Sequence, residues 1–344
     1  MNNILCLDIG SGTQDVLYYQ ADKEIENCPK FILPAPAVAV SRQIKRQTRR
    51  GKALFLFGKN MGGGFSGAVR EHLKTGLSVS TTADAALAVS DNLQKVRDMG
   101  IDVNEVRKPD ESPIFLADFD PGYWRAFLNM AGLDYPDLVL ACAQDHGFHP
   151  QESNRRGRFR FWEKFLTHSQ GMISRLLFAT PPEEMTRLKV LSESIGCGLV
   201  ADSGSAAALG ALYDSRVSSL AQKRGICVVN IGNSHTVAFL VFRDRIWGIY
   251  EHHTGMLHSE KLWTQLERFR RGMLNNDEVF ADHGHGCCSM DLPEEAMRFE
   301  QICVLGPKRS LLQDYEVIYP CPGGDMMLAG CFGLLNGYFR QKES

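Results

Sequence analysis

The sequence lacks the features of several common protein classes. Its 38 basic and 40 acidic residues give a formal charge of −2, so no global positive excess favours nucleic acid or an anionic membrane. No apolar run is long enough to span a bilayer, and the first strand-like run begins too early to leave room for a signal peptide. We therefore expect a cytoplasmic protein that binds neither a membrane nor nucleic acid.

The spacing of the cysteines also lacks a paired motif. The ten cysteines form no C-x-x-C, and only Cys287 and Cys288 are adjacent. This usage favours a reducing compartment over a disulfide framework. Buried, unreactive thiols are expected within strand-like runs, at Cys6, Cys142, Cys227 and Cys303.

The alternation of predicted elements indicates an α/β fold. Strand-like runs lie at 4–9, 15–19, 53–58, 113–118, 137–143, 226–231, 236–242, 246–250 and 301–305. Helical periodicity lies at 82–99, 183–195, 204–222, 258–271, 293–299 and 326–339.

Two segments repeat one pattern of strand, tight polar turn and strand. Residues 4–19 read ILCLDIGSGTQDVLYY, and residues 226–241 read ICVVNIGNSHTVAFLV. In this alignment Asn230 takes the place of Asp8, and Gly232 that of Gly10. The chain is therefore predicted to contain two related halves, with chance similarity of two hairpins as the alternative.

The glycine turn of the first hairpin differs from helix-based phosphate loops. Asp15 stands where a dinucleotide fingerprint has its third glycine, no Walker A motif is present, and a strand follows the turn. A hairpin turn can still bind an anion through converging backbone amides, helped by the hydroxyls of Ser11 and Thr13. Asp8 at the strand end would then hold Mg²⁺ through water.

The paired hairpins resemble those of the actin-like ATPase superfamily, which includes actin, heat-shock chaperone ATPase domains and sugar kinases. Further segments follow in that superfamily's order: 201–212 and 325–335 resemble its two connecting helices, and 301–312 resembles its adenosine motif. The predicted helix crossing has small side chains at Ala206, Ala207, Ala208, Gly210, Ala211, Ala329, Gly330 and Gly333. The chain looks closest to a prokaryotic branch labelled pyruvate formate-lyase activating enzyme-like, although it lacks the C-x-x-x-C-x-x-C cluster motif of radical activases.

This resemblance implies two ribonuclease H-like domains with a nucleotide cleft between them. The implied limits are an N-terminal domain at 1–203, a connecting helix at 204–224, a second domain at 225–322, and a C-terminal helix at 323–344 that returns to the first domain.

The resemblance also implies ATP and Mg²⁺ as cofactors and assigns site residues. The phosphates would be held on one side by Gly10, Ser11, Gly12 and Thr13, and on the other by Asn230, Gly232, Asn233, Ser234 and His235. Gly306 would meet the nucleoside, and Asp8 would position the metal. Gln144 and Asp145 follow the strand at 137–143, where they would orient or deprotonate an attacking water or substrate hydroxyl. The alternative for Asp145 is that it caps a turn.

Two departures from the superfamily pattern leave the chemistry open. Asn230 adds no charge to offset Mg²⁺, and Pro307 follows Gly306 where a second glycine is common. The sequence fits a protein that hydrolyses ATP or transfers its phosphoryl group to a small-molecule or protein acceptor. It also fits a non-catalytic, nucleotide-dependent sensor or scaffold.

Two histidine-containing segments suggest a third possibility, a metal-dependent enzyme on the same fold. His146 and His149 lie in HGFH, and His283 and His285 lie in HGH. These side chains could bind Zn²⁺ or iron if the two segments face each other across the cleft. Their spacing matches no established closed zinc site, and flexible turns are the alternative.

Three further stretches are candidates for surface roles. The basic run at 42–52 is expected to be a solvated face. Arginines alternate with aromatics at 154–165, so a strand there would present an arginine face to an anionic substrate. The glycine-dense segment at 58–67 is expected to be a substrate loop or a mobile turn.

Overall fold

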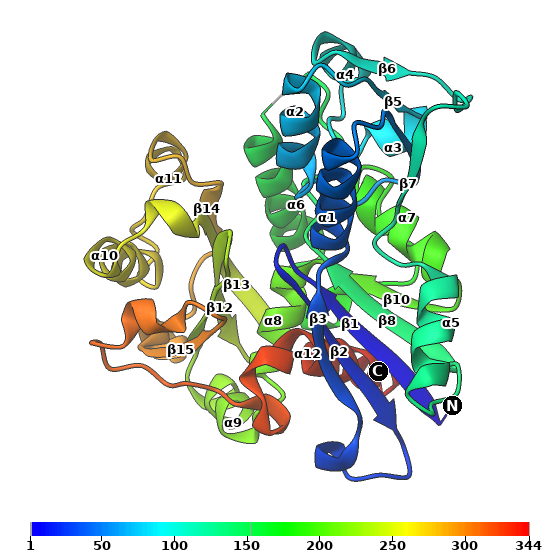
Figure 1. Ribbon diagram of the computed structural model, residues 1–344. Coiled ribbons are helices and arrows are strands. Elements are labelled where there is room, and N and C mark those ends of the chain that lie inside the picture. Colours follow the sequence, from blue (N-terminus) through cyan, green and yellow to red (C-terminus); the bar gives the residue numbers. More distant parts are fainter. Residues whose placement is uncertain (1, 152, 344) are drawn as a thin grey trace.

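The computed structural model describes residues 2–151 and 153–343, whose strands form three sheets (Figure 1). The first sheet has the order β3-β2-β1-β8-β10-β9. Its strands are β1 (Asn3–Ile9), β2 (Thr13–Gln20), β3 (Lys30–Pro34), β8 (Leu138–Ala143), β9 (Leu177–Phe178) and β10 (Gly198–Ala201). β1 pairs antiparallel with β2 and parallel with β8, so the first hairpin lies beside a parallel strand.

The second sheet repeats this arrangement. Its order is β14-β13-β12-β11-β15, from β11 (Ile226–Ile231), β12 (His235–Phe242), β13 (Arg245–His253), β14 (Gly286–Ser289) and β15 (Gln301–Leu305). β11 pairs antiparallel with β12 and parallel with β15, as β1 does with β2 and β8. The shared topology confirms the predicted α/β fold with two ribonuclease H-like units. We call the one built on the first sheet the first unit and the one built on the second sheet the second unit.

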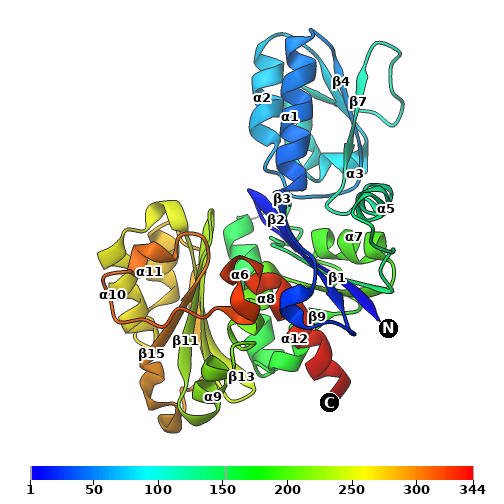
Figure 2. The same cartoon turned by 60° about the horizontal axis from the view of Figure 1, so that its bottom comes forward.

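A third, parallel sheet was not predicted. It has the order β6-β5-β4-β7, from β4 (Leu54–Gly58), β5 (Val79–Thr81), β6 (Ile101–Val103) and β7 (Ser112–Leu116). Helices α1 (Pro36–Arg49), α2 (Ser66–Lys74), α3 (Ala83–Ala86) and α4 (Leu93–Asp98) lie in the same stretch of chain. Ile44, Leu56, Phe65 and Ile114 belong to its separate core, so we call residues 36–116 the inserted unit. Figure 2 shows it standing apart at the top of the first unit.

The basic run at 42–52 lies mostly on α1, and its cationic side chains are largely exposed while Ile44 is buried, as predicted for a solvated face. The helix predicted at 82–99 is wrong in part. Thr82 caps α3 and Asn92 caps α4, each by accepting hydrogen bonds from backbone amides, so this stretch starts two short helices.

The remaining α-helices are α5 (Pro121–Met130), α6 (Asn154–His168), α7 (Thr186–Ile195), α8 (Ser203–Ala211), α9 (Ser215–Lys223), α10 (Ser259–Phe269), α11 (Asn276–Ala281) and α12 (Ala329–Glu343). Single turns of 3₁₀-helix lie at Ile25–Asn27, Ile173–Arg175, Thr254–Met256, Glu294–Phe299, Arg309–Leu312, Pro322–Gly324 and Met326–Leu328. The helix predicted at 293–299 is therefore only a kinked 3₁₀ segment, in which Met297 and Arg298 have positive φ.

Two other sequence expectations are corrected. The arginine-rich stretch at 154–165 is helix α6, not a strand, because its buried side chains Phe159, Trp162 and Leu166 recur every three or four residues. Its arginines therefore do not share one face. The connecting helix expected at 204–224 is divided into α8 and α9, because Asp214 accepts a hydrogen bond from the Arg216 amide and caps a new helix.

Helices α8 and α12 cross between the first and second sheets (Figures 1 and 2). A Cβ atom on Gly333 would lie 1.8 Å from the Ala206 carbonyl oxygen, and one on Gly210 would lie 2.0 Å from that of Ala329. Backbone therefore packs directly on backbone at the crossing, as the small residues predict. The largest core cluster is continuous from the first sheet through these helices to the second.

Within the part of the chain that the structure describes, no helix has the length and apolar character needed to cross a membrane.

Candidate functional site

The two hairpin turns have the same backbone geometry and meet each other. In the first, the Gly10 amide donates to the Thr13 carbonyl oxygen at 3.0 Å; in the second, the Gly232 amide donates to that of His235 at 2.9 Å. The Ser234 hydroxyl donates to the Ser11 hydroxyl at 3.2 Å, although the two residues are far apart in sequence. The predicted pair of hairpins thus faces a common space from opposite sides.

That space is a cavity of about 600 Å³ between the units. Residues from both turns line it, as do Asp8, Asn230, Gln144, Asp145, His146 and Gly306. The glycine-dense segment contributes Asn60–Gly64, which places a wall of the inserted unit against the same space. This wall is fixed to the first unit: the Gly62 amide donates to Asp118, whose carboxylate also accepts two bonds from the Arg187 guanidinium. All the residues assigned to the phosphates therefore lie around one cavity.

Two carboxylates stand at the base of the first hairpin. Asp8 and Asp15 are directly opposite each other in the β1–β2 register, and both line the cavity. Burial raises the pKa of Asp8 to about 6, despite the hydrogen bond that its Oδ1 accepts from the Cys142 thiol. Burial and then the charge of Asp8 raise the pKa of Asp15 to about 7. Asp15 Oδ1 is buried without a hydrogen-bond partner among the described residues, as expected for an oxygen that could face a cation or its water shell.

Asn230 occupies the matching place in the second hairpin and contacts the predicted nucleoside turn. Gly306 follows β15 with φ +95°, and a Cβ atom there would lie 2.7 Å from Asn230 Oδ1 and 2.4 Å from the Ile231 carbonyl oxygen. Only glycine fits both the conformation and the space. The turn is therefore held tightly against the end of β11, with Pro307 also lining the cavity.

Gln144 and Asp145 follow β8, but their side chains have structural partners. The Asp145 carboxylate accepts hydrogen bonds from the Gly147 amide at 2.7 Å and the Leu188 amide at 2.9 Å, which ties the loop to the start of α7. Burial raises the pKa of this carboxyl group. Gln144 donates its Nε2 to Glu251 at 3.0 Å. The geometry thus gives Asp145 the capping contacts that were the alternative to a catalytic assignment.

A buried charge network, which the sequence did not reveal, lies beside these residues. The Arg158 guanidinium of α6 bonds to Asp202 at 2.7 Å and to Glu251 of β13 at 2.7 Å. Its side chain is 3% exposed and that of Glu251 is 0% exposed. Trp162 also donates to Glu251. Burial opposes charge on Arg158, but the charges of Asp202 and Glu251 raise its pKa overall. The network connects the first unit, the start of α8 and the second unit.

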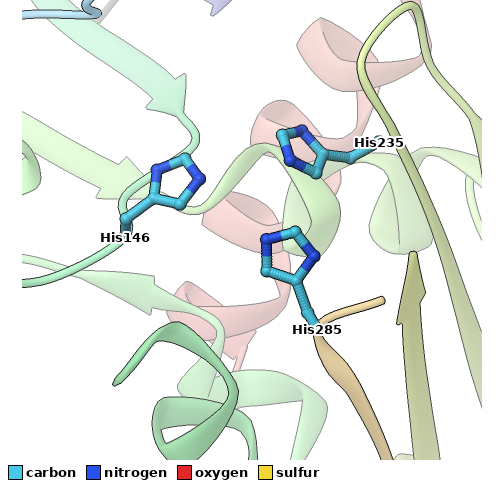
Figure 3. Close-up of side chains that lie close together, drawn as sticks. All are labelled: His146, His235 and His285. Carbon is cyan, nitrogen blue, oxygen red and sulfur yellow. The ribbon is translucent and has the colours of Figure 1, made fainter. Parts of the chain in front are cut away.

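Three histidines from separate segments meet at one place (Figure 3). They lie within electrostatic reach of Arg158 and Glu251 of this network. His146 lies in the loop after β8, His235 begins β12, and His285 precedes β14. One ring nitrogen from each lies within 4.8 Å of the others. Burial lowers the pKa to about 3 for His146, about 4 for His235 and about 2 for His285, so all three rings are neutral near pH 7.

The other two histidines of the predicted metal set are elsewhere. The His149 ring packs against Phe161, and His283 is an exposed residue with φ +66° after α11. The structure thus brings together one histidine from each predicted segment and adds His235, which the sequence assigned to the phosphates.

The ten cysteines are all free. Those expected to be buried thiols in strands are buried. Burial also raises the pKa of Cys287 to about 12, so this neighbour of Cys288 is not poised as a thiolate.

Residues 61–311, well over half of the chain, match the family described as "Putative pyruvate format-lyase activating enzyme (DUF1786)", and the chain belongs to this family. No curated protein sequence matches it.

Solved structures similar to the chain include Lmo2764, a putative N-acetylmannosamine kinase from Listeria monocytogenes, at 10% identity and a TM-score of 0.38, covering 99% of both chains. The ethanolamine utilization protein EutJ from Carboxydothermus hydrogenoformans is similar at 9% identity and a TM-score of 0.29, covering 97% of this chain and 89% of that one. An exopolyphosphatase from Cytophaga hutchinsonii is similar at 8% identity and a TM-score of 0.31, covering 99% of this chain and 89% of that one.

Proposed function

We propose that the cavity binds a nucleoside triphosphate with Mg²⁺ and transfers its terminal phosphoryl group to water or to another acceptor. The observation that carries this proposal is the convergence of two hairpin turns with matching backbone hydrogen bonds on one cavity. Turns of this kind offer backbone amides and hydroxyls to an anion from two sides. Such a clamp also couples the bound ligand to the relative position of the units.

The residues of the first hairpin suit the hydrated metal. Asp8 and Asp15 supply oxygen ligands, which Mg²⁺ prefers, and the unpartnered Oδ1 of Asp15 is available to a metal-bound water. When bound, Mg²⁺ would offset charge on the phosphates. Ser11 and Thr13 would donate to the phosphates from this side, Asn233 and Ser234 from the other, and Gly306 would meet the nucleoside.

Phosphoryl transfer also needs a group that orients the acceptor. Gln144 lines the cavity and follows β8, so it is our candidate for this role. Asp145 would act by positioning the loop, since both of its carboxylate oxygens already accept backbone hydrogen bonds.

The test is binding and turnover of ATP with Mg²⁺ by the full chain. We expect ATP–Mg²⁺ to raise the melting temperature and phosphate release to follow, with binding weakened at least about tenfold, or about 1.4 kcal/mol, in Asp8→Asn. Asp22→Asn is the matched control, because Asp22 is exposed at the far end of the same hairpin. Absence of any ATP–Mg²⁺ effect on wild-type melting would contradict the proposal.

A second candidate function is nucleotide sensing without turnover, which Asn230 favours because the second hairpin brings no carboxylate to the metal. In this case ATP–Mg²⁺ binds and compacts the protein, but single-turnover assays release no phosphate. Compaction without phosphate release by the wild type would support sensing. Phosphate release by the wild type that is lost in Gln144→Ala, while compaction persists, would support transfer.

A further inference from the structure

The meeting of His146, His235 and His285 is not explained by the phosphate site. Their segments are distant in the chain, and they belong to two units: His146 to the first, His235 and His285 to the second. In Figure 3 the three rings surround one small space. A fourth ring, that of His253, packs against two of them, with centroids 4.9 Å from His235 and 4.7 Å from His285.

Three ring nitrogens of this cluster have no hydrogen-bond partner among the described residues. They are His235 Nε2 and both ring nitrogens of His285, and all three are buried. Buried polar atoms in folded proteins are nearly always paired with protein, water or an ion. Unpaired nitrogens on His235 and His285, in a group of three histidines whose ligand atoms lie within 4.8 Å of one another, therefore indicate a site for a ligand that accepts lone pairs.

The charges around the rings balance. The nearest charged groups are the buried network, in which the Arg158 guanidinium bonds to the carboxylates of Asp202 and Glu251, and Arg155, whose guanidinium donates to the Gly284 carbonyl oxygen next to His285. These two arginines and two carboxylates carry no net charge, so a cation would not enter a site of net positive charge.

We propose that His146, His235 and His285 bind a divalent transition metal ion of the Zn²⁺ class, which bridges the first and second units at the edge of the nucleotide cavity. Imidazole nitrogens suit Zn²⁺ and its first-row neighbours, whereas Mg²⁺ prefers the carboxylates of the first hairpin. Three protein ligands leave a coordination position open, as in catalytic sites rather than structural ones.

The open position would face the cavity, because His146 and His235 line it. His285 lines a second, smaller cavity of about 260 Å³ between α6 and α11. The metal would thus sit between the two spaces. In a tetrahedral site the ligand nitrogens are roughly 3.3 Å apart, so binding would draw the two units closer than the 4.8 Å limit seen here.

The first experiment measures metal binding by the full chain without nucleotide, so its outcome is independent of the proposed function. Chelator-treated protein is dialysed against Zn²⁺ and its content measured, and Co²⁺ is added as a visible probe. We expect one equivalent of metal and the absorption of four-coordinate, nitrogen-ligated Co²⁺. Binding of less than one equivalent of either ion, with no Co²⁺ absorption, would overturn the proposal.

Substitutions identify the ligands. Loss of a residue that only hydrogen-bonds to a metal ligand costs about 10- to 100-fold in metal affinity. His285→Ala and His235→Ala each remove a ligand itself, so each should weaken metal binding by more than this. His283→Asn is the matched control: this position is exposed, two residues from His285, and Asn tolerates its positive φ. His168→Ala, at the exposed end of α6, is a second control. Equal affinity in the ligand and control variants would overturn the assignment.

Folding of the variants is checked separately by melting in the presence of chelator. If an alanine variant is unfolded there, His146→Gln replaces it, because His146 lies in a loop and its loss leaves both units' strands intact.

A separate experiment tests whether the metal bridges the first and second units. Small-angle scattering of wild-type protein should show Zn²⁺-dependent compaction, and His146→Gln should abolish it because the remaining ligands belong to one unit. Compaction that persists in His146→Gln, or full affinity in that variant, would overturn the bridge.

Discussion

The two hairpins have one backbone plan but carry different chemistry. Their turns close with matching hydrogen bonds, yet Asp8 and Asp15 of the first correspond to Asn230 and Val237 of the second. Where the first hairpin has Thr13, the second has His235. One side of the cavity therefore offers oxygen ligands and the other offers nitrogen ligands. Under the two proposals, the copies share one backbone turn toward the phosphates but suit different metals.

The largest expected effect comes from disrupting the buried charge network that connects the first and second units. Arg158→Ala leaves Asp202 and Glu251 buried without their partner, which costs about 3–5 kcal/mol. We expect this loss in the free energy of the first unfolding transition in urea. Arg216→Ala removes an exposed guanidinium from its ion pair with Asp214 and is the control, with a far smaller loss expected. Similar losses in both variants would show that the buried network does not join the units energetically.

The next prediction makes the hairpins more alike. Asn230→Asp adds a carboxylate at the place of Asp8, so the Mg²⁺ concentration needed for half-maximal nucleotide binding should fall about tenfold, or about 1.4 kcal/mol. Titration of Mg²⁺ at fixed nucleotide measures this shift. Asn233→Asp, in the turn itself, should instead weaken binding because its charge faces the phosphates. If Asn230→Asp leaves the Mg²⁺ requirement unchanged, the proposed metal position is wrong.

The pH dependence of stability should have opposite signs for the groups on the two sides of the cavity. Asp8 and Asp15 have raised pKa values in the folded state, about 6 and about 7, so these two groups bind more protons in the folded protein than in the unfolded one between about pH 4 and pH 7. Their contribution to stability therefore falls as the pH rises from about 4 to 7.

The three histidines act in the opposite direction. Their folded pKa values of about 2 to 4 lie below the unfolded value, so their contribution rises with pH up to about 6.5. Each proton is worth up to about 1.4 kcal/mol per pH unit. Urea denaturation at pH 5 and pH 8 with EDTA measures how the free energy of unfolding changes between the two pH values. Relative to wild type, this change should be more positive for Asp15→Asn, because less stability is lost on raising the pH, and less positive for His285→Ala, because less is gained. Equal pH dependence in wild type and both variants would contradict the assigned shifts.

The smallest effect is expected where the turns touch. Ser234→Ala removes the bond to the Ser11 hydroxyl, which is exposed, so stability should change by no more than about 0.5 kcal/mol. Nucleotide affinity should fall only a few-fold, since one donor to the phosphates is lost. A loss of affinity as large as that of Asp8→Asn would place the main phosphate contacts on the second hairpin.

Local patterns predicted the parts of the fold that depend on neighbouring residues. The hairpins were visible because a glycine turn between two apolar runs is a short-range signal, and the helix crossing because small residues are clustered near Gly210 and Gly333. The stretch at 154–165 was misread since alternating arginines and aromatics imitate a strand, whereas burial follows Phe159 and Trp162 around a helix.

Tertiary contacts explain what the sequence did not show. His146 and His149 are close in the chain, but the loop directs them to different partners, and the same holds for His283 and His285. Only the folded chain adds His235 from the other hairpin. The network of Arg158, Asp202 and Glu251 likewise has no spacing signal, because its members come from three distant elements.

The buried position of Glu251 has a kinetic consequence. A movement that opens the cavity by separating β13 from α6 must pull this carboxylate from Arg158 and Trp162, and water must enter before either charge is stabilised again. Hydration of this pair would therefore contribute to the barrier to such an opening. Ligand exchange should consequently be slow even where ligand binding is weak, and residence time rather than affinity should report on the state of the network.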